Sequence, residues 1–154
     1  MARGVLAHFV HHNAFLDGRL FSIQPDASKI YDAVYTARMA PFKRHELAQE
    51  IPSLLIIGGT VTPEDSDEHF QRIRAALLQA TFAYDGPKQV LNEQEVNGLL
   101  NQSRVGLCLS ACEGAIYATV EYLLCGLPFV TTASPGGRDS RLDPRFTRIV
   151  NDDP

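Results

Sequence analysis

Two glutamates, Glu113 and Glu121, lie eight residues apart, and a Gly-Leu-Pro turn at residues 126–128 follows them. The spacing places the first carboxylate in the loop after an apolar segment and the second about two turns into the next helix. Ionised carboxylates accept hydrogen bonds from hydroxyl groups. A loop and a helix that present two of them together suit a long, polar, anionic ligand better than a small one.

Paired carboxylates also carry out glycoside hydrolysis, where the two carboxyl groups lie about 5 to 9.5 Å apart. Eight helical residues rise about 12 Å, and the real separation depends on how much of residues 110–115 is loop. The spacing therefore favours binding over hydrolysis and leaves hydrolysis as an alternative.

Three segments are expected at the ligand-binding edge of a parallel sheet, which lies outside the carboxyl ends of its strands. They are residues 36–45, 58–60 and 110–114. Arg38 and Lys43 supply two cations to one anion, and the start of the Glu121 helix supplies backbone N–H donors. These groups predict a diphosphate site. Glu121 would then accept hydrogen bonds from ribose hydroxyls, and Glu113 would meet hydroxyls beyond the phosphates.

Each of these features also has a purely structural interpretation. Arg38, Lys43 and Arg44 are equally consistent with a solvated basic stretch. Glu121, flanked by apolar residues, is either on an exposed edge or buried with a partner. The pair at residues 58–59 is either a tight turn or a point of close approach to a ligand.

Apolar strands and amphipathic helices alternate from residue 29 onward, which predicts a Rossmann-like α/β domain with three layers and a parallel sheet. We expect strands at residues 30–36, 54–57, 81–84, 105–109, 129–132 and 147–150. We expect helices at residues 44–51, from Thr62 onward, after Asn92 and at residues 117–125. The second helix should bury Phe70, Ile73, Leu77 and Leu78.

The whole chain has 154 residues, which suits one domain with a full core. We interpret residues 1–28 as an interdomain connection or the remnant of a preceding domain, and residues 29–154 as a domain truncated at its C-terminus. A Leu-Asp-Gly-Arg turn and a histidine cluster, His8, His11 and His12, fall in the first segment. We interpret these histidines as solvated or locally packed rather than metal-binding.

Composition excludes several classes of function. A net charge of −4 argues against nucleic-acid binding, and no apolar run reaches the length of a membrane span. The three cysteines, Cys108, Cys112 and Cys125, are an odd number among apolar residues, which predicts reduced, buried thiols and a cytoplasmic protein. The spacing of Cys108 and Cys112 without a second ligand pair does not predict a metal site.

The run from Glu113 to Glu121, with Gly114, Gly126 and Pro128, resembles the donor-site signature of retaining glycosyltransferases of the GT-B fold (group 1, or family 4). Residues 35–47 resemble the segment in which that family carries a phosphate-binding arginine and lysine. The resemblance covers roughly residues 29–150 and implies the carboxyl-terminal, donor-binding one of two Rossmann-like domains. Many relatives have a second glycine where this chain has Ile116, which leaves the identity of the donor sugar open.

The resemblance implies a role for each matching residue. Arg38 and Lys43 would neutralise the departing diphosphate, Glu113 would contact the transferred sugar near the reacting carbon, and Glu121 would bind the ribose. The expected substrate-binding residues are completed by a set that lines the loop and the helix start: Gly59, Gly114, Ala115, Ile116, Tyr117 and Thr119. No metal or other cofactor is required, because the cationic side chains stabilise the charge on the leaving group.

The expected partners are a nucleotide-sugar donor and a hydroxyl acceptor, which the missing N-terminal domain would bind. Peripheral membrane association of the full-length protein is a further option, and nucleic acid is not expected. We expect residues 1–154 alone to bind a nucleoside diphosphate weakly and to transfer no sugar.

The alternatives are a non-catalytic nucleotide-binding or regulatory module of the same fold, and a flavodoxin-like signalling domain. Arg38 argues against the signalling domain, because such a domain is expected to have an acidic cluster at the end of its first strand, where this chain has an arginine. The loop at residues 132–139 is read either as a flexible segment facing the ligands or as a structural turn.

Overall fold

A computed structural model describes residues 8, 10, 12–59, 67–84 and 91–152. Six strands form one sheet: β1 (Tyr31–Thr36), β2 (Leu54–Ile57), β3 (Thr81–Phe82), β4 (Ser103–Cys108), β5 (Phe129–Thr132) and β6 (Thr147–Val150). The described residues also form three α-helices, α1 (Asp67–Ala76), α2 (Glu93–Asn101) and α3 (Tyr117–Leu124), and four short 3₁₀ turns, η1 (His12–Phe15), η2 (Pro41–Lys43), η3 (His45–Ala48) and η4 (Arg138–Arg141).

The sheet has the strand order β3-β2-β1-β4-β5-β6, and every neighbouring pair is parallel. The order reverses between β1 and β4, where the chain leaves β3 and returns through α2. In a doubly wound sheet a crevice opens at that point, outside the carboxyl ends of the strands. The predicted Rossmann-like α/β class is therefore confirmed, and the topology indicates where a ligand should bind.

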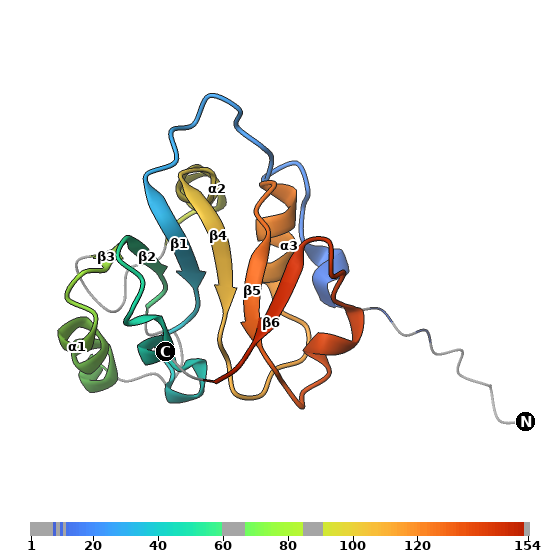
Figure 1. Cartoon of the computed structure of the whole chain (residues 1–154). Helices are drawn as coiled ribbons and strands as arrows, with labels where there is room; N and C mark the ends of the chain where they lie inside the picture. The colour runs from blue at the N-terminus through green and yellow to red at the C-terminus, as the bar shows by residue number, and fades with distance from the viewer. Residues whose placement is uncertain (1–7, 9, 11, 60–66, 85–90, 153–154) are drawn as a thin grey trace, which may run out of the picture.

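Alternation along the strands gives the sheet two buried faces. Val34, Leu55 and Ile57 face the layer of α2 and α3, together with Tyr122 and Phe129. On the opposite face, Tyr35, Leu54 and Ile56 pack with Met39, Phe70 and Ile73 under α1 and η3. In Figure 1, α2 and α3 lie behind the sheet, and α1 lies beside the β3 edge. The three predicted layers are thus present.

Three details of the predicted elements are wrong. Residues 44–51 do not form one α-helix, because Arg44 adopts a left-handed conformation (φ 51°) between η2 and η3. Leu78 is 87% exposed instead of buried, since α1 ends at Ala76 and Leu78 lies in the turn that follows. Cys112 is also exposed, whereas Cys108 and Cys125 are buried thiols as predicted. The predicted start of the second helix, from Thr62 onward, lies outside the described residues up to position 66.

The segment that precedes β1 packs against the α2–α3 layer (Figure 1). Phe21 is buried in the core beside Tyr122, and the N–H groups of Ser22 and Gln24 donate to Asn97 and Asn101 of α2 at 3.1 and 2.7 Å. Asn101 returns a bond to the carbonyl of Ser22 at 2.9 Å. These contacts join the end of this segment to the sheet domain, and its origin as an interdomain connection stays a prediction.

Candidate functional site

A cavity of about 430 Å³ opens at the carboxyl edge of the sheet, where the strand order reverses. Eight of the ten predicted site residues line it: Arg38, Lys43, Gly59, Glu113, Ala115, Ile116, Tyr117 and Glu121. They come from the segments after β1, β2 and β4 and from the first five residues of α3. Parallel strands bring the ends of these loops to one edge, so residues up to 83 positions apart in the sequence meet in one cavity.

The two predicted phosphate-binding cations converge on one aromatic ring. Arg38 Cζ lies 5.3 Å and Lys43 Nζ 5.2 Å from the centroid of Phe42. Lys43 is only 7% exposed, and the hydroxyl of Tyr35 donates to its carbonyl at 2.6 Å. The turn η2 therefore directs the ammonium group into the cavity and does not leave it solvated.

Lys43 and Glu113 form a tight ion pair in the cavity, with Nζ and Oε1 2.5 Å apart. The second oxygen of Glu113, Oε2, is buried and has no hydrogen-bond partner among the described residues. A buried acceptor left without a donor costs about 1–3 kcal/mol, so such an atom in a cavity marks a position for a donor from a ligand. The pair thus holds an acceptor without a hydrogen-bond donor next to the ammonium group of Lys43.

Glu121 lies on α3 in the same cavity, and burial raises its carboxyl pKa to about 7. The negative charge of Glu93, in the first turn of α2, raises the pKa further. At neutral pH this carboxyl group therefore exchanges between its charged and neutral forms. A hydrogen bond from a ligand hydroxyl would therefore change the protonation state of Glu121. Such a raised pKa is typical of a group in a binding site and not of a solvated helix residue.

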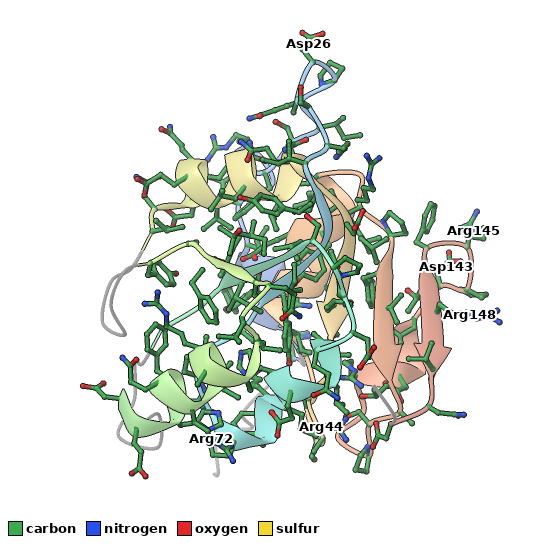
Figure 2. All side chains as sticks on the ribbon, turned by 60° about the vertical axis from the view of Figure 1, so that its left-hand side comes forward. Asp26, Arg44, Arg72, Asp143, Arg145 and Arg148 are labelled. Atoms are coloured by element: carbon green, nitrogen blue, oxygen red, sulfur yellow. The ribbon has the colours of Figure 1, made fainter. Side chains whose placement is uncertain are left out.

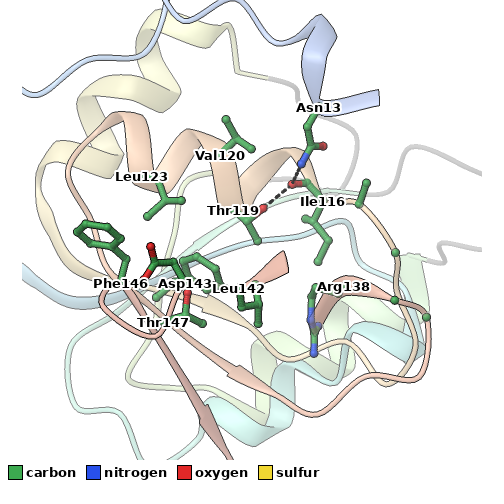
Figure 3. A pocket seen from close by; sticks show the side chains of 15 residues that line it. Asn13, Ile116, Thr119, Val120, Leu123, Arg138, Leu142, Asp143, Phe146 and Thr147 are labelled. Carbon is green, nitrogen blue, oxygen red and sulfur yellow. Dashed lines mark hydrogen bonds between the residues drawn. The ribbon is translucent and has the colours of Figure 1, made fainter. Parts of the chain in front are cut away.

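The two remaining predicted residues, Gly114 and Thr119, do not line this cavity. Gly114 and Thr119 line a separate cavity of about 510 Å³, which Figure 3 shows between α3 and the segment before β6. There the hydroxyl of Thr119 donates to the carbonyl of Ile116 at 2.7 Å, and Asn13 donates to the same carbonyl at 3.1 Å. Thr119 thus closes the first turn of α3 and does not line the cavity of Lys43 and Glu121.

Gly58 and Gly59 serve the two purposes that the sequence left open. A Cβ atom on Gly58 would lie 1.7 Å from the carbonyl oxygen of Ala37, so this position needs glycine for backbone packing. On either side of this contact, the N–H of Ala37 donates to the carbonyl of Ile57 at 2.9 Å, and the N–H of Met39 donates to the carbonyl of Gly59 at 3.0 Å. Gly59 itself lines the cavity, which keeps close approach to a ligand open there.

Arg44 holds the neighbouring strand ends together. Its guanidinium donates to the carbonyl of Leu109 and to the hydroxyl of Thr132, both at 2.7 Å, and pairs with Asp152 at 2.5 Å. Figure 2 shows Arg44 on the η2–η3 segment, toward the side of the sheet where β6 lies. Arg44 is thus not part of a solvated basic stretch but links the ends of β4, β5 and β6.

Among the residues that the structure describes, no group of three or more His, Cys, Asp or Glu side chains could hold a metal ion. Of the described helices, none is long and apolar enough to cross a membrane.

No family of known proteins matches the sequence, and no curated protein does. Solved structures do match, each over 88% of this chain. The C-terminal domain of the group 1 family glycosyl transferase LpcC from Francisella tularensis matches at 17% identity and a TM-score of 0.63, over 80% of its length. Sucrose-phosphate synthase from Thermosynechococcus elongatus matches at 18% and 0.67, and Anabaena HepE, solved with UDP and glucose, at 17% and 0.68. The chain has the fold of the carboxyl-terminal domain of a GT-B glycosyltransferase.

This GT-B domain spans 38% of the sucrose-phosphate synthase chain and 41% of the HepE chain. It therefore corresponds to one of the parts from which those longer proteins are built.

Sequence reasoning missed one side of the GT-B domain's cavity. Phe21, Tyr84, Leu91, Glu93 and Val96 also line it, mostly from the start of α2 and the segment after β3. The capping box at Asn92 and Glu95 correctly predicted where α2 begins, with bonds of 3.0 and 2.8 Å. A helix that starts at the carboxyl edge of a sheet brings its first turn to the ligand, and that signal could have identified Glu93.

Proposed function

We propose that this chain binds the nucleotide-sugar donor of a glycosyltransferase, which transfers the glycosyl group to a hydroxyl acceptor with retention. The observation that carries the proposal is the Lys43–Glu113 pair, with its unpartnered acceptor Oε2, in the cavity at the sheet edge that Arg38 also lines. A nucleoside diphosphate-sugar has anionic oxygens for the cations and sugar hydroxyls for the acceptor. HepE, with the same fold, was solved with UDP and glucose, which supports this class of ligand.

The polarity of the cavity indicates how the donor would lie. Tyr84, Leu91 and Val96 give the α2 side an apolar surface that suits a nucleoside base, and Glu121 lines the same cavity. Glu121 would accept hydrogen bonds from the ribose hydroxyls. Arg38 and Lys43 would contact the diphosphate, and Glu113 the sugar beyond it.

Chemistry in this arrangement consists of one bond exchange. The bond between the anomeric carbon and the diphosphate oxygen breaks, a bond to the acceptor oxygen forms, and the acceptor proton leaves with the diphosphate or to solvent. Negative charge develops on the diphosphate as it departs, and Arg38 and Lys43 would stabilise it more strongly in the transition state than in the bound donor. No metal is needed in this proposal. The acceptor would bind to a second domain.

Calorimetric titration of the chain with UDP, GDP and ADP tests the proposal. We expect binding of at least one of them, and a loss of about tenfold or more in affinity for both Lys43→Ala and Glu121→Ala, because each removes a charged or buried partner of the ligand. Arg148→Ala is the control, since it removes a cation from the exposed face of β6. Unchanged affinity in both site variants would defeat the assignment.

A further inference from the structure

The loop between β5 and η4 packs against the main chain of Glu113. The side chain of Ser134 is 9% exposed, and its hydroxyl contacts both polar groups of the Glu113 backbone. The N–H of Glu113 donates to Ser134 Oγ at 2.9 Å, and Ser134 Oγ donates to the carbonyl of Glu113 at 3.2 Å. The N–H of Arg138 donates to that same carbonyl, also at 3.2 Å. Every polar backbone atom of Glu113 is thus fixed by this loop.

Steric contact reinforces these hydrogen bonds. A Cβ atom on Gly136 would lie 2.5 Å from both the carbonyl carbon and the oxygen of Glu113, and 2.6 Å from its nitrogen. Only glycine allows this approach, since real Cβ atoms do not come within 3 Å of backbone atoms. Gly136 therefore lets the loop lie flat against the Glu113 peptide.

The loop is itself anchored to the sheet. Arg138 is 5% exposed, and its guanidinium donates to the carbonyl of Ser110 at 3.4 Å, to the carbonyl of Thr132, and to Asp139 at 3.2 Å. Asp139 in turn accepts from the N–H of Ser134 at 2.6 Å. These bonds join the ends of β4 and β5, so the loop is a structural turn of fixed shape and not a flexible segment.

We propose that Ser134 and Gly136 are positioning residues that hold the Glu113 carboxylate for the transferred sugar. Ser134 and Gly136 fix the main chain of Glu113 from one side, and Lys43 holds Oε1 on the other at 2.5 Å. Oε2 is then the one carboxylate oxygen of Glu113 without a hydrogen-bond partner among the described residues, in a side chain that lines the cavity. The inference rests on the proposed function, and it predicts that the loop affects recognition of the sugar without affecting recognition of the nucleoside diphosphate.

The test compares the affinity of the chain for UDP-glucose and GDP-mannose with that for UDP and GDP. Using the pair that binds, we expect Ser134→Ala and Gly136→Ala to weaken binding of the nucleotide-sugar about fivefold or more, as for a lost or misdirected hydrogen bond. Binding of the nucleoside diphosphate should stay within twofold of the unchanged chain. Ser134→Thr, which keeps the hydroxyl, should restore sugar binding, and Pro135→Ala, at an exposed position of the same loop, should have no effect.

A double-mutant cycle separates positioning from general damage. Glu113→Gln should also reduce binding of the nucleotide-sugar, and adding Ser134→Ala should cause no further loss, because both act through one carboxylate. Additive losses, or equal losses for the nucleotide-sugar and the nucleoside diphosphate, would overturn the inference.

Amide hydrogen exchange tests the contact without any ligand. In Ser134→Ala the amide of Glu113 should exchange at least tenfold faster, while in Pro135→Ala it should not change. If no nucleotide binds, the proposed function fails while this measurement still decides whether the loop fixes Glu113. Unchanged exchange in Ser134→Ala would refute the loop's role even if nucleotides bind.

Discussion

Glu121 is the residue whose charge the cavity controls most directly. Burial first, and the charge of Glu93 second, raise its pKa to about 7. Ribose hydroxyls donate hydrogen bonds best to the ionised carboxylate, so a bound ribose should favour the charged form. If Glu121 binds ribose, the affinity for a nucleoside diphosphate should rise as the pH increases through about 7.

Titration at pH values from 6 to 8 checks this expectation. The ligand's terminal phosphate also titrates in this range, so the ratio of the affinities of the unchanged chain and Glu121→Gln is the informative quantity. We expect this ratio to rise with pH. In Glu93→Gln the rise should move to lower pH, because removal of the neighbouring negative charge lowers the pKa of Glu121. A ratio that does not vary with pH would exclude Glu121 from the ribose site.

At the scale of elements, one hydroxyl joins α3 to the sheet beneath the site. Tyr122 is fully buried, its oxygen accepts from the N–H of Thr36 at 2.8 Å, and it donates to the carbonyl of Leu107 at 3.2 Å. These partners lie near the carboxyl ends of β1 and β4, and Thr36 lines the cavity. Gly106 makes room for the ring, since a Cβ atom there would lie 2.2 Å from it.

Removal of that hydroxyl should therefore destabilise the domain. We expect Tyr122→Phe to lower the free energy of unfolding by about 1–3 kcal/mol, because it leaves the buried N–H of Thr36 without its acceptor. Urea denaturation measures the change. Tyr31→Phe, at a partly buried position at the start of β1, is the matched control and should cost less. Equal stability of Tyr122→Phe and the unchanged chain would show that another acceptor satisfies Thr36.

The strands and the start of α2 were predictable because local signals and tertiary packing agree there. Residues 54–57 form a continuous apolar run that is buried on both faces, and Asn92 with Glu95 forms the predicted capping box. Residues 41–48 were not predictable, because the left-handed Arg44 is held by partners after β4, on β5 and after β6 that lie 65 to 108 positions away. The same reason hid the contacts between residues 133–139 and Glu113. The sequence therefore predicted that most site residues lie at one edge of the sheet, but it did not predict which of them contact one another.

For the whole molecule, two buried ionisable groups should have opposite effects on the free energy of unfolding as the pH falls. His45 is fully buried beside Tyr35, with ring centroids 4.9 Å apart, and burial lowers its pKa from 6.5 to about 3. Between these values the unfolded chain binds one more proton than the folded chain, so acid destabilises the fold by up to about 1.4 kcal/mol per pH unit. The pKa of Glu121 is raised from 4.5 to about 7, so between these values the folded chain binds more protons and acid stabilises it.

These two contributions should largely cancel between pH 6.5 and 4.5, and below pH 4.5 His45 should act without this compensation. Glu121→Gln lacks the opposing contribution of Glu121. We therefore expect its free energy of unfolding to begin to fall near pH 6.5, whereas that of the unchanged chain should begin to fall near pH 4.5. His45→Phe, which keeps a buried ring of similar shape, should reduce the loss below pH 4.5. Urea denaturation from pH 7.5 to 3.5 measures all three profiles. Parallel profiles for Glu121→Gln and the unchanged chain would mean that Glu121 titrates near its ordinary pKa and lies in contact with water.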